Sequence, residues 1–208
     1  MKNWFARRGA LPITAYLLAL AAWLVLGAAH FGSDALAKAQ GRLAEETMAV
    51  TDWQLVGLTP NEDGTLTTVD GDPQMILENV GDRVVRTISY TAQFDGEARE
   101  MCLYYTTKVG EDYSADRRVF PQSVGEGRYI YTLPRTSLAA LRLDPCSPEE
   151  NKTVTLAVRA ITLNAADTLP AVWQYFVPTW YQAFCLVLYP ALAAAAVSMI
   201  FAVLKKEK

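Results

Sequence analysis

The sequence has a single histidine, His30, among its 208 residues. With no second imidazole, the chain cannot supply histidine to a Ser or Cys triad or to the usual zinc sites within its central part. His30 itself lies at the end of a long apolar run, which is typical of a polar residue at a membrane interface. The sequence therefore predicts a protein that is not an enzyme and holds no cofactor.

Charged residues are also absent from two long stretches, residues 10–31 and residues 176–204. A helix crosses the apolar core of a bilayer with about 20 residues, so each stretch is long enough to span the membrane. Pro190 would allow a kink in the second stretch, and aromatic residues suited to the interface surround its start. These are Trp173, Tyr175, Phe176, Trp180 and Tyr181. The sequence predicts two transmembrane helices in a lipid bilayer.

Basic residues flank both stretches on their outer sides, in the N-terminal segment 1–9 and the C-terminal segment 205–208. Because lysine and arginine close to a span stay on the cytoplasmic side, both ends are expected to be cytoplasmic. The segment between the spans would then lie on the non-cytoplasmic side of a plasma membrane, which we expect to be bacterial. An alternative is a cleaved signal peptide, since Gly27-Ala28-Ala29 resembles a cleavage site, although the apolar run is long for one.

The segment between the spans is acidic, with 13 basic and 21 acidic residues and hence a net charge of 13 − 21 = −8. Such a charge is expected to repel nucleic acid and anionic lipid. Nucleic acid is therefore not expected as a partner.

Between the spans we expect three parts: a helical stalk over residues 32–49, a β domain over residues 50–166 and a linker over residues 167–175. The stalk has apolar residues at helical spacing, with Ser33 or Asp34 as its cap. Short β-rich segments separated by turn signals predict an all-β sandwich or jelly roll. The predicted strands are 53–58, 65–69, 74–77, 84–94, 100–107, 118–121, 128–133, 138–143 and 153–164.

Two local patterns refine this picture. Asp95-Gly96 is a hairpin signal, which predicts that the strand 84–94 pairs with the strand 100–107. Val154, Leu156 and Val158 alternate with smaller or polar residues, which places one face of the last strand on a core.

Cys185 falls within the second span, which leaves Cys102 and Cys146 in the exported domain. Export permits oxidation, so one alternative is a Cys102–Cys146 disulfide and the other is two buried thiols. Asp70 and Asp72 offer hard oxygen ligands of the kind that calcium prefers, so they are candidate metal ligands. Paired carboxylates of a glycoside hydrolase are a lower-ranked alternative, because most acidic residues fall in turns.

Aromatic side chains are the candidate contacts for a carbohydrate, because a sugar ring presents an apolar face surrounded by hydroxyl groups. Trp53, Tyr105 and Tyr113 are the residues we select. Tyr104 and Tyr105 are adjacent in a predicted strand and therefore point to opposite faces. Tyr113 lies in a polar loop and is expected to be exposed.

The sequence also resembles the jelly-roll ectodomains of bacterial membrane proteins that take part in surface-polysaccharide assembly. The resemblance covers residues 66–164 and rests on short elements: Thr68-Val-Asp-Gly-Asp-Pro-Gln74, Met101-Cys-Leu-Tyr-Tyr105, Leu141-Arg-Leu-Asp-Pro145 and the strand that follows. It implies a carbohydrate-binding-like module of the cell envelope, with a glycan ligand. Members often carry a glycosyltransferase or many-span transferase beside this domain, and here only two spans flank it, so transferase activity would come from a partner.

Two hypotheses follow. The first is a non-enzymatic, membrane-anchored accessory module that contacts glycan or a glycosyltransferase partner. The alternative is a structural subunit of a membrane complex that binds no sugar. Small residues at Ala191 and at positions 193–196 would let another helix approach the second span closely, which favours this alternative.

Overall fold

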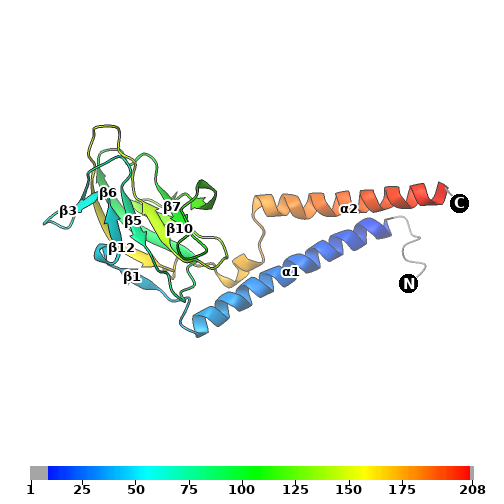
Figure 1. The fold of residues 1–208 in the computed structure, drawn as a ribbon. Helices are drawn as coiled ribbons and strands as arrows, with labels where there is room; N and C mark the ends of the chain where they lie inside the picture. The colour runs from blue at the N-terminus through cyan, green and yellow to red at the C-terminus, as the bar shows by residue number, and fades with distance from the viewer. Residues whose placement is uncertain (1–8, 207–208) are drawn as a thin grey trace. The chain divides into compact units, whose positions relative to one another are not determined.

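The structure is a computed structural model that describes residues 9–206. It contains two long helices, α1 (Ala10–Ala39) and α2 (Trp180–Lys206), and a set of antiparallel strands that lie between the helices in the sequence (Figure 1). The contacts divide the chain into two units, one formed by the helices and one over Ala37–Leu169. The basic residues Lys2, Arg7, Arg8 and Lys208, used above to predict orientation, lie outside the described residues.

Within residues 9–206 the strands form two sheets. Sheet A has the order β3-β4-β12-β6-β10-β9. Strand β4 pairs with the N-terminal half of β12, and β1 pairs with the C-terminal half of the same strand, on the same edge as β4. Sheet B has the order β2-β5-β11-β7-β8. The strands of sheet A are β1 (Glu46–Met48), β3 (Leu58–Pro60), β4 (Leu66–Thr68), β6 (Thr87–Asp95), β9 (Gln122–Ser123), β10 (Arg128–Thr132) and β12 (Thr155–Leu163). Those of sheet B are β2 (Gln54–Val56), β5 (Gln74–Leu77), β7 (Cys102–Tyr105), β8 (Arg118–Val119) and β11 (Leu141–Asp144). Short 3-10 helices are η1 (Val50–Asp52), η2 (Ala115–Arg117) and η3 (Val172–Tyr175).

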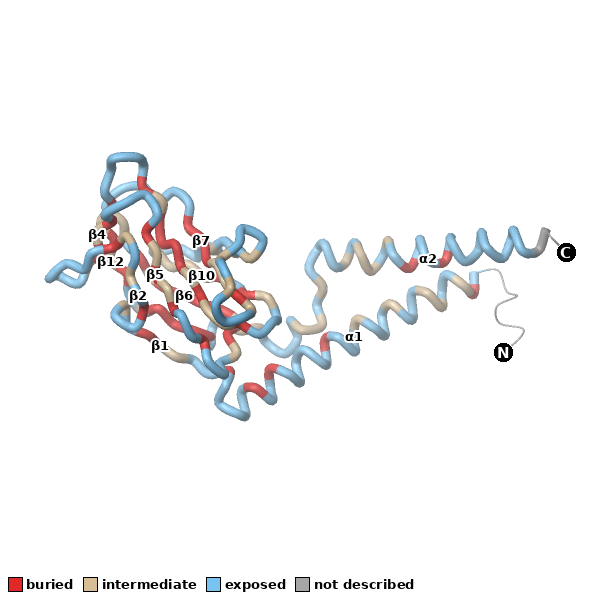
Figure 2. The backbone as a smooth tube through the Cα atoms, viewed as in Figure 1, coloured by how far each residue is buried: buried red, intermediate tan, exposed pale blue. Residues whose placement is uncertain are grey.

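The core takes alternate side chains from the strands of both sheets. In β12, Leu156 is fully buried and Val158 nearly so, as their alternation predicts. Sheet B contributes Met75, Leu103 and Leu143 to the same cluster. The two sheets therefore share one hydrophobic core in a sandwich-like arrangement, which confirms the expected β architecture. Figure 2 shows the buried residues along the strands.

The helices α1 and α2 are long and apolar enough to cross a membrane. Their large apolar side chains are mostly exposed, among them Leu18 at 66% and Phe201 at 60%. Within this unit the Tyr16 hydroxyl donates a 2.9 Å hydrogen bond to the Val187 carbonyl, close to Pro190. The Trp23 indole donates another, of 3.0 Å, to the Phe176 carbonyl. Each bond gives a polar side chain of α1 a partner within the same unit.

The predicted stalk is not a separate helix. Helix α1 runs without interruption from Ala10 to Ala39, so Ser33 and Asp34 lie inside it and do not cap it. It ends where Gly41 adopts a φ of 72°, a left-handed conformation that favours glycine and closes helices. Residues 46–48, predicted as helix, form β1 and pair with β12.

The second helix and the β domain also differ from their predicted bounds. Helix α2 starts at Trp180 instead of residue 176, because Thr179 caps it: the Gln182 backbone donates to the Thr179 hydroxyl, and the Thr179 backbone donates to the Gln182 side chain. The compact β unit covers Ala37–Leu169, wider than the predicted 50–166. The predicted linker 167–175 contains η3.

The predicted hairpin between residues 84–94 and 100–107 does not form. Strand β6 pairs with β10 and β12 in sheet A, whereas β7 pairs with β8 and β11 in sheet B. After Gly96 the chain therefore crosses to the other sheet. The Asp-Gly signal does coincide with the end of β6 at Asp95, but it does not form the predicted hairpin turn. The same alternation of buried residues suits a strand in either sheet, so it could not identify the partner strand.

The predicted strand 53–58 is divided at Gly57, which has a φ of 65°. A Cβ atom at this position would lie 2.3 Å from Oδ1 of Asp70, so a larger residue does not fit without movement. The break sends β2 into sheet B and β3 into sheet A. This glycine is thus a corner between the two sheets.

Candidate functional site

The outer face of sheet B carries a row of side chains that are polar or aromatic except for one isoleucine. Along β11, Leu141 and Leu143 are fully buried on the core side, so Arg142 points to the outside. The strand register places one residue from each strand of sheet B side by side on that outer face. The row runs Gln54, Ile76, Arg142, Tyr104 and Arg118. We call this surface the outer sheet face.

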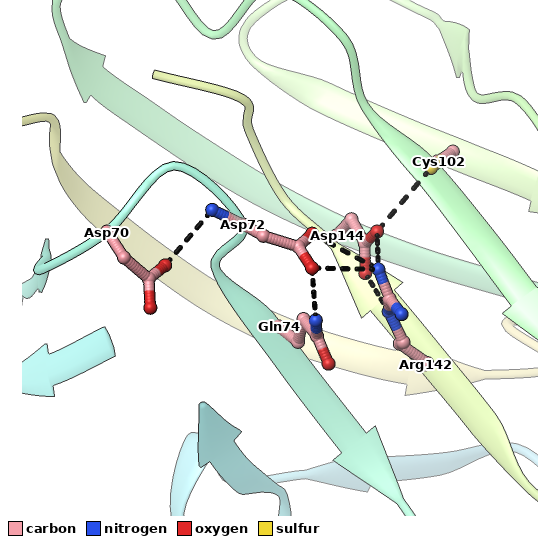
Figure 3. A network of polar contacts seen from close by, with 6 residues as sticks. All are labelled: Asp70, Asp72, Gln74, Cys102, Arg142 and Asp144. Carbon is pink, nitrogen blue, oxygen red and sulfur yellow. Dashed lines mark hydrogen bonds and ion pairs between the residues drawn. The ribbon is translucent and has the colours of Figure 1, made fainter. Parts of the chain in front are cut away.

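Arg142 is the centre of a network of ion pairs on this face (Figure 3). Its guanidinium donates to both carboxylate oxygens of Asp144, at 2.8 and 2.7 Å, and to Asp72 at 3.1 Å. Asp72 also accepts from Gln74 at 2.5 Å, and its backbone N–H donates to Asp70 at 3.0 Å. The side chains of Arg142 and Asp144 are 18% and 11% exposed, so their charges satisfy each other largely out of water.

Two tyrosine rings contact the same guanidinium. The Arg142 carbon lies 4.8 Å from the ring centroid of Tyr104 and 5.8 Å from that of Tyr113. Next to them, Arg118 lies 4.8 Å over the ring of Phe120, which is 59% exposed. Guanidinium and aromatic planes attract each other, and the contacts hold these rings in fixed orientations. The outer sheet face therefore brings aromatic rings and guanidinium groups into contact.

The titratable groups of this face do not favour nucleophilic chemistry. Burial and, to a smaller extent, the neighbouring Asp144 carboxylate raise the pKa of Cys102 to about 11. Burial also raises the pKa of Asp144, an effect that its hydrogen bonds with Arg142 only partly offset. The Cys102 thiol donates to Asp144 at 3.8 Å, so it is held protonated. A protonated thiol is a poor nucleophile.

The three aromatic candidates selected from sequence lie in different environments. Trp53 is 3% exposed and belongs to the core, so its ring is not accessible to a sugar. Tyr105 is half-buried and packs against the core from the inner face of β7. Tyr113 lies on the outer sheet face next to Arg142, but it is half-buried and not exposed as expected. Only Tyr113 of the three is thus positioned as a contact, and its role stays a prediction.

The sequence analysis selected Tyr105 in place of its neighbour Tyr104, and it did not select Arg142. Both could have been found from the alternation in their own strands, because each lies next to a fully buried leucine: Leu103 in β7, and Leu141 and Leu143 in β11. What the alternation could not reveal is that the register places the two side chains side by side across β7 and β11.

The disulfide alternative for Cys102 and Cys146 is not the one observed. Both are buried free thiols. The register sets Cys102 in β7 opposite Asp144 in β11. Cys146 lies two residues after Asp144 in the chain and is part of the core cluster. Burial raises the pKa of Cys146 to about 11 as well.

The predicted calcium ligands also have other partners. Asp72 is paired with Arg142, and Asp70 accepts from the Asp72 backbone in a local turn. Among residues 9–206, no three His, Cys, Asp or Glu side chains come together in a way that could hold a metal ion. A guanidinium in contact with Asp72 also opposes a bound cation.

Comparisons with known proteins identify no family for this chain. No protein-family model matches the sequence, and no curated protein matches it. Among solved structures, the low-affinity xylan-binding module CBM86 from Roseburia intestinalis is similar with a TM-score of 0.37 and 13% identity, over 58% of this chain and 94% of the module. A family two carbohydrate esterase from Cellvibrio japonicus is similar with a TM-score of 0.35 and 14% identity, over 58% of this chain and 33% of the esterase. Scores at this level assign neither a ligand nor an activity.

Proposed function

We propose that this chain is a non-enzymatic, membrane-anchored module that binds carbohydrate through the outer sheet face. The observation that supports the proposal is the arrangement of Tyr104, Tyr113 and Arg142 beside the amide and carboxylate of Gln74 and Asp72. A sugar ring offers C–H groups to an aromatic plane and hydroxyl groups to planar polar side chains. The surface contains both kinds of group.

The ion pairs suit a neutral glycan better than a charged one. Arg142 is already balanced by Asp144 and Asp72, so the face has no large excess of one sign at its centre. The pairs also hold the side chains in place before a ligand arrives. A binding surface with few side chains to immobilise has a lower entropic cost of association.

The proposed role is in surface-glycan assembly, on the non-cytoplasmic side of the plasma membrane. Two apolar helices flank the β unit in sequence, and the basic residues beyond them favour cytoplasmic ends. A glycan-binding unit placed there would contact polysaccharide as it leaves the membrane, or a glycosyltransferase partner that makes it. The resemblance described above favours the same role.

Binding of full-length protein to a glycan array tests the proposal. The protein should be kept in a polyoxyethylene detergent, because alkyl glycoside detergents carry sugar headgroups that would compete. Tyr113→Ala removes a ring and should weaken binding about fivefold, whereas Tyr113→Phe keeps the ring and should weaken it less. Gln54→Ala on the face should weaken binding more than Gln122→Ala, an exposed glutamine of sheet A. Folded protein that binds no glycan would refute the proposal.

The second candidate is a structural subunit, and a groove in the helical unit favours it. The groove between α1 and α2 has a volume of about 680 Å³ and an almost wholly apolar lining that includes Ala15, Ala19, Ala22 and Ala193. Small residues let a further helix approach closely in a bilayer. Co-purification of a multi-span protein, lost when Ala19 is changed to Leu and combined with no glycan binding, would support this candidate.

A further inference from the structure

The outer sheet face has a different character at its β8 edge than at its centre. Val119 of β8 packs against the core, so its neighbours Arg118 and Phe120 lie on the outer side by alternation. The register sets Arg118 beside Tyr104 of β7. Arg118 is exposed, and Phe120 is 59% exposed, which is unusual for a large aromatic side chain. We call Tyr104, Arg118 and Phe120 the β8 edge.

Two aromatic side chains hold Arg118 in place although it is exposed. Its guanidinium carbon lies 4.8 Å from the ring centroid of Phe120. Its guanidinium also forms a hydrogen bond with the Tyr104 hydroxyl, which partly offsets the rise in the pKa of Tyr104 caused by burial. A side chain that is oriented before a ligand arrives loses less entropy when the ligand binds.

The positive charge of Arg118 has no acidic partner. Glu111, in the loop before β8, is already paired with Arg117, and it accepts from the backbone N–H groups of Thr107 at 3.0 Å and Lys108 at 3.2 Å. Among residues 9–206, Arg118 forms no ion pair with a carboxylate. One guanidinium at the β8 edge is therefore free to bind an anionic group.

Other arginines of the β unit do not combine these two properties. Arg83, Arg128 and Arg142 each form an ion pair with a carboxylate. Arg159 is exposed like Arg118, but within the described part of the chain no aromatic ring lies against its guanidinium. Arg118 is thus both oriented by aromatic groups and unpaired, as a residue that recognises a ligand would be.

We propose that the β8 edge recognises the carboxylate of an acidic sugar unit, such as a uronic acid, in a glycan bound by the outer sheet face. The inference rests on the proposed function and specifies its ligand class. A uronic acid carries its carboxylate next to the C–H groups of the ring, so one unit can contact Arg118 and Phe120 together. Planar guanidinium and carboxylate groups form paired hydrogen bonds, and an aromatic ring suits the C–H groups.

The balanced centre of the face gives this ligand a second property. Arg142 is paired there with Asp144 and Asp72, which suits neutral sugar units. The expected glycan therefore contains neutral units as well as an acidic one. The acidic unit lies over β8 and the neutral units lie over the neighbouring strands.

Calorimetry with native and carboxyl-reduced oligosaccharides tests the inference, since reduction replaces the carboxylate by an alcohol and leaves the rest of the sugar unchanged. The probes are hexasaccharides that contain galacturonate, glucuronate or mannuronate units, each in both forms. Full-length protein is used in polyoxyethylene detergent, as above. Wild-type protein should bind at least one native probe about tenfold more tightly than its reduced form, because charge-assisted hydrogen bonds are made only to the carboxylate.

Three variants assign this preference to Arg118. Arg118→Gln should weaken binding of the native probe about tenfold and leave binding of the reduced probe unchanged. Arg118→Lys keeps the charge but not the paired donors, so it should retain part of the preference. Arg159→Gln is the matched control, because it makes the same change of charge at an exposed arginine of β12. Equal loss in Arg118→Gln and Arg159→Gln would show unspecific attraction and overturn the inference.

The same measurements separate failure of this inference from failure of the proposed function. Equal binding of native and reduced probes, or binding of neutral glycans alone, would show that the β8 edge recognises no carboxylate, although the protein still binds sugar. Folded protein that binds neither these probes nor any glycan on the array would overturn both proposals.

Discussion

Replacing Asn164 by Ala should destabilise the β unit strongly, because one buried side chain connects three segments of the chain. Asn164 is 2% exposed and has a φ of 54°. Its Oδ1 accepts from the Arg86 N–H at 2.7 Å, and its Nδ2 donates to the carbonyls of Val84 at 2.8 Å and Ala44 at 3.2 Å. Removal of the amide leaves these backbone groups without their partner.

The size of the effect follows from two contributions. Each of the two short hydrogen bonds contributes about 1 kcal/mol or somewhat more, since the group left behind is buried. The left-handed backbone adds about 1 kcal/mol, because alanine tolerates a positive φ less well than asparagine does. Together these predict a loss of about 3 kcal/mol in the free energy of unfolding.

Hydrogen exchange of the slowest amides in β6 and β12 measures this loss in the β unit without interference from the helices. A loss of about 3 kcal/mol corresponds to exchange about 150-fold faster. Asn151 is the matched control, because it has a φ of 62° but is exposed, so Asn151→Ala removes only the backbone contribution. If both variants accelerated exchange equally, the Asn164 amide would contribute nothing and the reasoning would be refuted.

Three further predictions concern single side chains. The Arg117 guanidinium lowers the pKa of Glu111 from 4.5 to about 2, so the stability that Glu111 contributes should be complete above pH 4.5 and lost as the pH falls through about 2. A titration followed by NMR should show this loss of stability, and Glu111→Gln should remove the pH dependence. Cys102 and Cys146 should resist alkylation at pH 8 in the folded protein and react after unfolding, and the intact mass should show no disulfide. Rapid alkylation of the native state would contradict the burial of both thiols. Trp53 is buried and its Nε1 has no hydrogen-bond partner among the described residues. Trp53→Phe should therefore lower the free energy of unfolding, measured by hydrogen exchange, by about 1 kcal/mol, against about 4 kcal/mol for Trp53→Ala. Equal losses of stability in the two variants would indicate that the N–H has a hydrogen-bond partner.

The parts of the fold that sequence could predict are those set by periodicity. The apolar helices were found because twenty or so uncharged residues have few other uses, and the burial of Leu156 and Val158 follows from their alternation. Strand β5 has the predicted bounds, because Pro73 and the preceding Asp-Gly-Asp turn mark its start. Each of these signals lies within a few residues of the element that it defines.

The choice of strand partners could not be predicted in the same way. Strand β6 ends at Asp95, but β7 then joins sheet B, where Leu103 is fully buried. Trp53 was assigned to the surface for a similar reason: its size and polar N–H suit either a ligand site or a core. In both cases the local sequence permits two environments, and the contacts of distant segments decide between them.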